Sequence, residues 1–293
     1  MALQSLLLAF SDRTSRQCRP ILDREGRVFA VLGGCPRDSG WSDVNDDVCR
    51  ICEEGRAAYA ATSQQASHRR GNYTAVSVGI SFGGGQKRVS NLAHAKHNQA
   101  VIGSLLQQTS IRRIAAFGDI GLLRLFGPRL HRHYEATLSS VCEHHPELRR
   151  NFDRSAFSCS TFNLGPQTRT VPHRDHLNLP YGWCAITAFG NFDPKQGGHI
   201  ILWDLRMVIE FPPGSTILIP SAILMHSNTA IAPEERRYSF TQYTPGGVFR
   251  WVASGFQTVK EAGLSARSLN AAGRKRWEEG VGLLSLWSEL CAE

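Results

Sequence analysis

Residues 157–228 read FSCSTFNLGPQTRTVPHRDHLNLPYGWCAITAFGNFDPKQGGHIILWDLRMVIEFPPGSTILIPSAILMHSN. Short runs rich in apolar, aromatic and β-branched residues alternate there with turn-forming sequences such as DPKQGG (193–198) and PPGS (212–215), a pattern typical of strands. A further run, RRYSFTQYT, occupies 236–244. The predicted strands are 157–164, 168–175, 183–190, 199–205, 207–211, 215–221 and 236–244. Strands this short and this closely spaced favour an antiparallel sandwich or jelly roll.

The flanks of this stretch differ in character. Residues 27–35 and 73–82 resemble strands, whereas 43–64, most of 92–150 and roughly 258–290 show the spacing of apolar residues that is typical of helices. We therefore predict an α+β chain in three parts: an N-terminal α/β flank (1–154), a β core (155–255) and a C-terminal helical segment (256–293). The three parts are expected to form one compact unit.

Composition narrows the class of protein. The 293 residues carry a net charge of +8, which favours attraction to a polyanion such as nucleic acid. The opening MALQSLLLAF lacks the marks of a signal peptide, and the longest apolar runs fall short of the roughly 20 residues of a membrane-spanning helix. Eight scattered cysteines, including Cys49 and Cys52 in a single CxxC, are expected to be free thiols in a reducing compartment.

The segment VPHRDH contains a candidate pair of metal ligands. Residues at i and i+2 of a strand project to the same face, so His173 and Asp175 are expected to point into the barrel together. Non-haem Fe(II) oxygenases need two histidines and one carboxylate on one face of the metal, and His226, after the buried run 215–221, is the expected third ligand. The rival pairs in HYE (133–135) and HPE (145–147) fall in predicted helices, where i and i+2 diverge.

The cosubstrate of such a site also requires residues of its own. 2-Oxoglutarate chelates iron through its keto acid end and leaves a distal carboxylate, which needs a buried cation and a hydroxyl. Arg237 and Ser239 share one predicted strand and one face, and a guanidinium matches a carboxylate with two parallel hydrogen bonds. Arg236, which points the other way, is expected to lie on the surface.

The stretch from about 157 to 252, with the residues quoted above and RRYSFTQYTPGGVFRW (236–251), resembles the TET/JBP dioxygenases, especially those of basidiomycete fungi. Weaker similarity covers about 20–156, including GISFGGGQKRVSNL. The resemblance implies a double-stranded β-helix, Fe(II) and 2-oxoglutarate as cofactors with O2 as cosubstrate, and oxidation of a methyl group on a base flipped out of duplex DNA. The cysteine-rich zinc region of animal TET enzymes has no counterpart here.

The resemblance also assigns roles to individual residues. It implies His199 near the keto acid end of 2-oxoglutarate, Asn178 against the base's Watson–Crick edge, and Tyr243 as an aromatic that stacks on the extruded base. The glycine-rich segment 83–91 lacks a phosphate-loop signature and is expected to lie near the active-site mouth, with Lys87 and Arg88 touching DNA.

Two alternatives remain open from the sequence. The same triad would serve an AlkB-like demethylase or another 2-oxoglutarate oxygenase or hydroxylase, and a transposon-associated DNA-binding protein could retain the barrel without catalysis. Neither the preferred base, 5-methylcytosine or N6-methyladenine, nor the extent of oxidation follows from these residues. A DNA substrate implies a nuclear protein, and no obligate protein partner is evident from the sequence.

Overall fold

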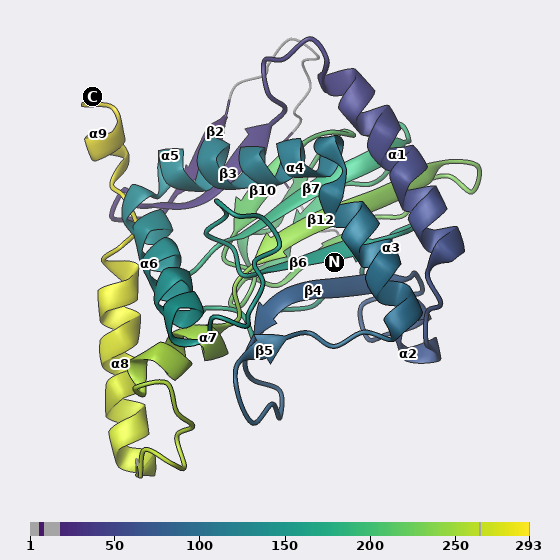
Figure 1. The fold of residues 1–293 in the computed structure, drawn as a ribbon. Helices are drawn as coiled ribbons and strands as arrows, with labels where there is room; N and C mark the ends of the chain where they lie inside the picture. The colour runs from purple at the N-terminus through teal and green to yellow at the C-terminus, as the bar shows by residue number, and fades with distance from the viewer. Residues whose placement is uncertain (1–5, 9–17, 264, 293) are drawn as a thin grey trace.

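The computed structural model describes residues 6–8, 18–263 and 265–292, so part of the opening segment MALQSLLLAF lies outside the described residues. Two sheets and a layer of helices make up the fold (Figure 1). The large sheet has the order β2 (Arg19–Leu22), β3 (Val28–Gly34), β10 (Thr216–Ile219), β7 (Cys184–Asn191), β12 (Arg236–Tyr243), β6 (Cys159–Asn163), β4 (Ala75–Ser81) and β5 (Ser90–Asn91). The small sheet has the order β1 (Leu6–Leu8), β9 (Met207–Ile209), β8 (Ile200–Leu202) and β11 (His226–Asn228).

The chain alternates between the two sheets from β6 onward. It passes from β6 in the large sheet to a bridge between His173 and β11 in the small one, returns for β7, crosses for β8 and β9, and ends with β10, β11 and β12 in turn. All neighbouring strands in this region are antiparallel. This winding is a double-stranded β-helix, so the predicted α+β class with a jelly-roll core flanked by helices is confirmed.

The prediction of a strand over 168–175 is wrong. The segment is irregular, and its pairing with β11 consists of one bridge in which His173 and His226 exchange two backbone hydrogen bonds of 3.0 Å. Proline at 172 has no backbone N–H to donate. In addition, the side chain of Asn228 donates to the carbonyl of Thr168 and accepts from the amide of Thr170, which replaces part of a ladder.

Helices cover one face of the large sheet (Figure 1). The N-terminal half contributes α1 (Trp41–Ala58), α2 (Ser63–Ala66), α3 (Lys96–Gln107), α4 (Thr109–Ala116), a π-helical turn (Phe117–Leu123), α5 (Arg124–Phe126) and α6 (Pro128–His144). The C-terminal part contributes α7 (Gly246–Ala253), α8 (Ala266–Val281) and α9 (Trp287–Leu290). The predicted helical regions are therefore confirmed in type, although α6 ends at His144 and the HPE sequence lies in the turn that follows, not in a helix.

The π-helical turn passes very close to the large sheet. A Cβ on Gly118 would lie 2.9 Å from the side-chain oxygen of Gln242 on β12 and 3.0 Å from the Cβ of Ala185 on β7. Only a residue without a side chain permits this approach without displacing a neighbour. Other residues of the turn join the helix layer to the core: Phe117 packs against two apolar clusters, and Leu122 and Leu123 belong to one of them.

The two faces of β12 have different neighbours. Tyr238 donates to Glu53 of α1, and Phe240 belongs to the apolar cluster between the sheet and the helices. Because side chains alternate along a strand, Arg237, Ser239 and Tyr243 face the opposite way, toward the interior of the barrel. Polar residues on this inner face position the candidate site, while the other half of the interior is filled by apolar side chains of β3, β8, β9 and β10.

Within the described part of the chain, none of the helices combines the length and the apolar character that crossing a membrane requires.

Candidate metal centre

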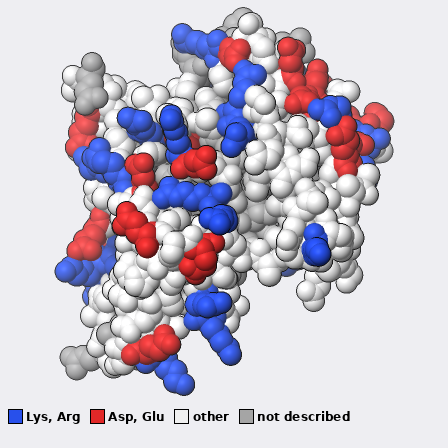
Figure 2. All heavy atoms as spheres, viewed as in Figure 1, with Lys and Arg blue, Asp and Glu red and all other residues white. Residues whose placement is uncertain are grey.

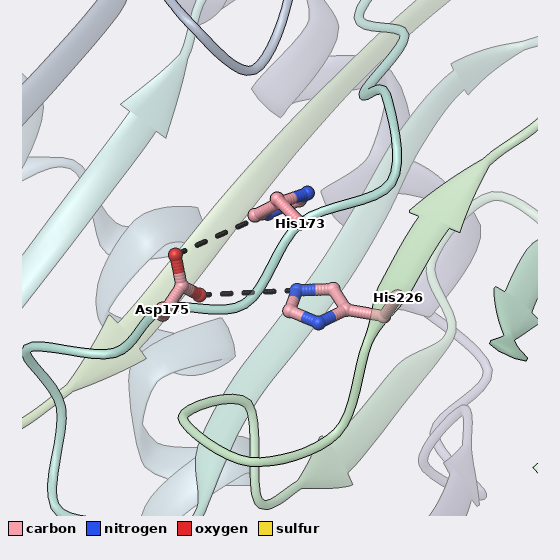
Figure 3. Close-up of side chains that lie close together, drawn as sticks. All are labelled: His173, Asp175 and His226. Atoms are coloured by element: carbon pink, nitrogen blue, oxygen red, sulfur yellow. Dashed lines mark ion pairs between the residues drawn. The ribbon is translucent and has the colours of Figure 1, made fainter. Parts of the chain in front are cut away.

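Three donors meet inside the barrel (Figure 3). Asp175 lies between the two histidines: its Oδ1 is 3.9 Å from Nε2 of His173, and its Oδ2 is 3.8 Å from Nε2 of His226. All three ligand atoms lie within 4.8 Å of one another, and the described residues contain no second such group of three. His173 and Asp175 come from the irregular segment before β7, and His226 is the first residue of β11.

Backbone contacts set the orientation of both imidazoles. Nδ1 of His173 donates to the carbonyl of Val171 (2.8 Å), and Nδ1 of His226 donates to the carbonyl of Leu224 (2.9 Å). Each Nε2 therefore keeps its lone pair for a ligand bond. Burial, and next the charge of His226, lower the pKa of His173 to about 4, so this ring is neutral near pH 7. Neutral imidazole is the form that binds metals.

The donor set fits a divalent first-row metal. Two imidazole nitrogens and one carboxylate form a facial triad, the arrangement typical of non-haem Fe(II) oxygenases. Metal–ligand bonds of about 2.0–2.2 Å bring neighbouring donors to about 3 Å of one another, closer than the 3.8 and 3.9 Å observed here.

Arg70, which sequence reasoning missed, contacts the carboxylate of the triad. Its Nη1 lies 3.3 Å from Oδ1 of Asp175. The segment is fixed beside the triad because the carbonyl of Arg70 accepts from Val171, and because Gly71 packs so closely that a Cβ there would lie 2.3 Å from the carbonyl oxygen of Arg169. One carboxylate oxygen thus faces Arg70 and the other faces His226. Arg70 belongs to no motif, so only the fold reveals it.

Arg237 is a buried cation with unused hydrogen-bonding capacity. Only 2% of the residue is exposed; Nη1 donates to the carbonyl of Thr168 (3.0 Å), and Nε has no hydrogen-bond partner. Burial lowers the pKa of this guanidinium to about 10, so it remains charged near pH 7. Since an unpaired buried charge is costly, the interior at Arg237 fits a bound anion such as a carboxylate. Arg236, in contrast, has a side chain 54% exposed that pairs with Glu53.

Two further buried polar atoms lie along the same part of the barrel. Oγ1 of Thr168 and Nε2 of His199 have no hydrogen-bond partner. Asn228 links their segments, because its amide donates to the carbonyls of Thr168 and Thr229, and Thr229 in turn pairs with the backbone of His199. Ser239, on the inner face of β12, accepts a hydrogen bond of 2.8 Å from Asn163 and keeps its own proton to donate.

Aromatic hydroxyls line the interior between these groups. Tyr73 is buried, and the charges of Arg70, Arg237 and Asp175 all act on it, so its phenol lies near both the triad and Arg237. Burial raises the pKa of Tyr73 to about 12. Sequence reasoning assigned this residue only to a strand. Its position beside both sites makes it a candidate contact for a molecule that spans them.

Tyr243 also lies inside the barrel. Its hydroxyl bonds to Ser77 and Thr161, which are themselves 2.7 Å apart, and burial raises its pKa. These bonds fix the ring while leaving part of the residue accessible.

Asn178 lies at the turn after the triad. Its amide nitrogen is 3.2 Å from Oγ of Ser221, and its backbone N–H donates to the carbonyl of Asp175. Asn178 therefore forms the turn and also presents a partly exposed amide beside the triad.

The glycine-rich segment 83–91 connects β4 and β5 next to this turn. Gln86 braces it through hydrogen bonds to Ser81 and Ser90, and a Cβ on Gly84 would lie 3.9 Å from Cδ1 of Leu177. Lys87 and Arg88 are exposed at its tip. The segment lies close to the residues that follow Asp175, although nothing in the fold by itself assigns it a ligand.

None of the eight cysteines, all of which the structure describes, is in a disulfide, and this holds for Cys49 and Cys52 on α1, as expected from the sequence.

Comparisons with known proteins give structural matches only. No protein-family model and no curated protein sequence matches the chain. Solved structures that match include NgTET1 in complex with 5mC DNA (12% identity, 84% of each chain covered, TM-score 0.48) and OsALKBH1 (10% identity, 76% of this chain and 100% of the other, TM-score 0.36). A Pseudomonas putida prolyl-4-hydroxylase matches at 13% identity over 69% of this chain and 86% of its own, with a TM-score of 0.33. Identities and scores this low assign the chain neither a family nor a substrate.

Proposed function

We propose that this protein is an Fe(II)- and 2-oxoglutarate-dependent dioxygenase that oxidises the methyl group of a modified base in DNA. One observation supports the enzyme class most strongly: the only three-donor group of the described residues lies in the same barrel interior as a buried arginine with an unpaired Nε. A metal site alone would fit many proteins. A metal site and an anion site in one interior fit a cosubstrate that has a chelating end and a distal carboxylate.

The proposed roles follow from the chemistry of each side chain. His173, Asp175 and His226 would hold the iron, which leaves three coordination positions for other ligands. Arg237 would bind the distal carboxylate through its free Nε, and Ser239 would donate its hydroxyl proton to the same group. When bound, iron and 2-oxoglutarate supply the power to activate O2 and to insert one oxygen atom into a C–H bond.

Other side chains would bind the cosubstrate and limit the access of water to it. His199, with its unpartnered Nε2, would donate to the keto acid end of the cosubstrate, as the resemblance implies. Tyr73 would contact the cosubstrate, because it is buried near both Arg237 and Asp175. The apolar half of the barrel would limit the access of water to the interior, which would strengthen the hydrogen bonds of a ligand to Arg237.

We also propose that the substrate is DNA, and this proposal is supported by the sequence resemblance and by the charge of the chain. A net charge of +8 favours a polyanion. Asn178 would read the edge of a flipped base, and Tyr243 would stack on it. Exposed Lys87 and Arg88 on the segment beside Leu177 would contact phosphates next to the opening. A DNA-acting enzyme of this kind would work in the nucleus.

The test is mass spectrometry of nucleosides after incubation with iron, 2-oxoglutarate and DNA duplexes that carry either 5-methylcytosine or N6-methyladenine. The expected result is conversion of one of these bases to its hydroxymethyl or more oxidised form. Turnover of the free nucleoside at the same rate as the duplex would exclude DNA as the physiological substrate. That result would favour the AlkB-like or other hydroxylase alternative, which the same triad would serve.

A further inference from the structure

A cavity of about 1170 Å³ is lined neither by the metal donors nor by Arg237, although its wall residue Phe192 lies under the guanidinium of Arg237, 5.9 Å from ring centroid to Cζ. It opens between the start of α1, the turn after β7 and the segment that joins β9 to β10. Its walls are formed by 34–36, 38, 39, 41, 42, 45, 46, 191–195, 210, 212, 213, 215 and 235. None of these residues takes part in the proposed dioxygenase chemistry, so the cavity has no role in the function described so far.

Carboxylates dominate the charge of this cavity. Asp38, Asp46, Asp193, Glu210 and Glu235 line it, against the single cation Lys195. Arg113 offsets Asp38 by an ion pair from outside the lining. The helix beside it adds to the negative potential, because Figure 2 shows acidic side chains gathered over α1 at the upper right, whereas the chain as a whole carries +8. A locally acidic hollow on a basic protein attracts cations.

The environment of Glu210 indicates that the negative charge of the cavity serves to bind a ligand. The residue is only 8% exposed, yet its carboxylate forms no hydrogen bond or ion pair with any part of the chain that the structure describes. The oxygens of Glu210 are not fully buried, so they are open to the cavity and can pair with a cation there. Asp193 and Glu235 differ, because backbone amides of Lys195, Asp193 and Ala232 hold them in place. Glu210, which has no partner, thus lines the same cavity as two carboxylates, Asp193 and Glu235, that backbone amides already orient.

The shape argues for a cationic side chain and against a metal ion. Among the described residues, only the His173, Asp175 and His226 group brings three ligand atoms together, so the carboxylates of this cavity do not converge as an ion would require. The volume is that of a site for a sizeable ligand. Trp41 and Phe192 provide aromatic walls, and prolines 36, 194, 212 and 213 provide apolar ones. Such walls suit the aliphatic stem and the charged end of arginine or lysine.

We propose that this acidic cavity binds an arginine or lysine side chain of a basic peptide segment on a partner protein. The cation would pair with Glu210, and Asp46 at the exposed rim would attract neighbouring positive residues of the same peptide. Trp41 and Phe192 would contact the side chain between these two points. No metal donor lines the cavity, so the peptide would bind in the absence of iron and 2-oxoglutarate.

The test is isothermal titration of the intact protein, without iron or 2-oxoglutarate, with the capped peptide Gly-Arg-Gly-Arg-Gly. The matched control peptide carries citrulline in place of arginine, which removes the charge and keeps the shape. We expect binding of the arginine peptide with loss of at least about tenfold in affinity for citrulline, since a charge-assisted hydrogen bond to a buried carboxylate is lost. Equal affinity for both peptides would overturn the proposal.

Protein variants locate the binding. Glu210→Gln should weaken the arginine peptide by about tenfold. Asp46→Asn, at the exposed rim, should weaken it by about threefold, whereas Asp43→Asn, an exposed residue of α1 outside the lining, should change it less than twofold. If Glu210→Gln does not fold, the affinities of Asp46→Asn and Asp43→Asn for the arginine peptide still test the proposal. Equal effects of that pair would mean attraction to the whole helix and would refute a site, as would competition by millimolar calcium at one ion per protein.

Discussion

Replacing Arg237 by lysine tests the cosubstrate site by itself. Arg237 is 2% exposed, Nη1 is taken by the carbonyl of Thr168, and Nε is free. Lysine keeps a charge but lacks the planar fork, so it would lose one of the two hydrogen bonds to a carboxylate. A hydrogen bond to a charged group contributes about 1.5–3 kcal/mol, so the dissociation constant of 2-oxoglutarate should rise by about 10- to 150-fold.

The assay is calorimetric titration of 2-oxoglutarate into protein loaded with Mn(II), which avoids turnover. Arg236→Lys is the matched control: its side chain is 54% exposed and faces Glu53, so the dissociation constant should change less than about twofold. Metal affinity, measured without 2-oxoglutarate, should be the same in both variants and the wild type. A larger effect for Arg236→Lys than for Arg237→Lys would refute the assignment of the inner face of β12.

Four further outcomes are expected. Alanine at any one of the three metal donors should leave less than about a tenth of the turnover under saturating iron, and greater activity would remove that residue from the site. The free energy of unfolding of the metal-free protein should fall as pH falls from about 6.5 to about 4, because the folded state holds the pKa of His173 near 4 and the unfolded chain takes up the proton first. Urea unfolding at several pH values should show this dependence, and His173→Gln should reduce it. Tyr243→Ala should lower turnover of a methylated duplex by about tenfold or more, with the salt dependence of binding unchanged. Lys87→Gln or Arg88→Gln should each reduce the slope of log affinity against log salt by about one, and an unchanged slope would separate the segment 83–91 from DNA.

The fold could be predicted largely because its core strands carry strong local patterns. β7, β10 and β12 are buried runs bounded by glycine and proline turns; β10 and β12 lie within their predicted ranges, and β7 extends one residue beyond its range. The failure over 168–175 has a physical cause that no periodicity reveals. There, one asparagine, Asn228, replaces backbone ladder bonds from a distant point of the chain.

The residues of the candidate site also fall into those that the sequence predicts and those that only the fold reveals. The convergence of His173, Asp175 and His226 was predictable because a facial triad has a limited set of ligand types and spacings. Arg70 and Tyr73 were not, because they reach the site from a loop and a strand end that pack beside it only in the folded chain. Glu210 was also not predicted as a binding residue, since only the folded chain shows that it is buried and has no partner.

Succinate release per oxidised base measures the central claim most directly. A methylated duplex is incubated with iron, O2 and 2-oxoglutarate, and succinate and modified nucleosides are quantified in the same samples, with Asp175→Ala as the control that lacks one metal donor. The account predicts one succinate for each oxygen atom inserted into the methyl group, and neither product from the variant. Failure to form succinate with any methylated duplex, or base oxidation that persists in Asp175→Ala, would contradict it.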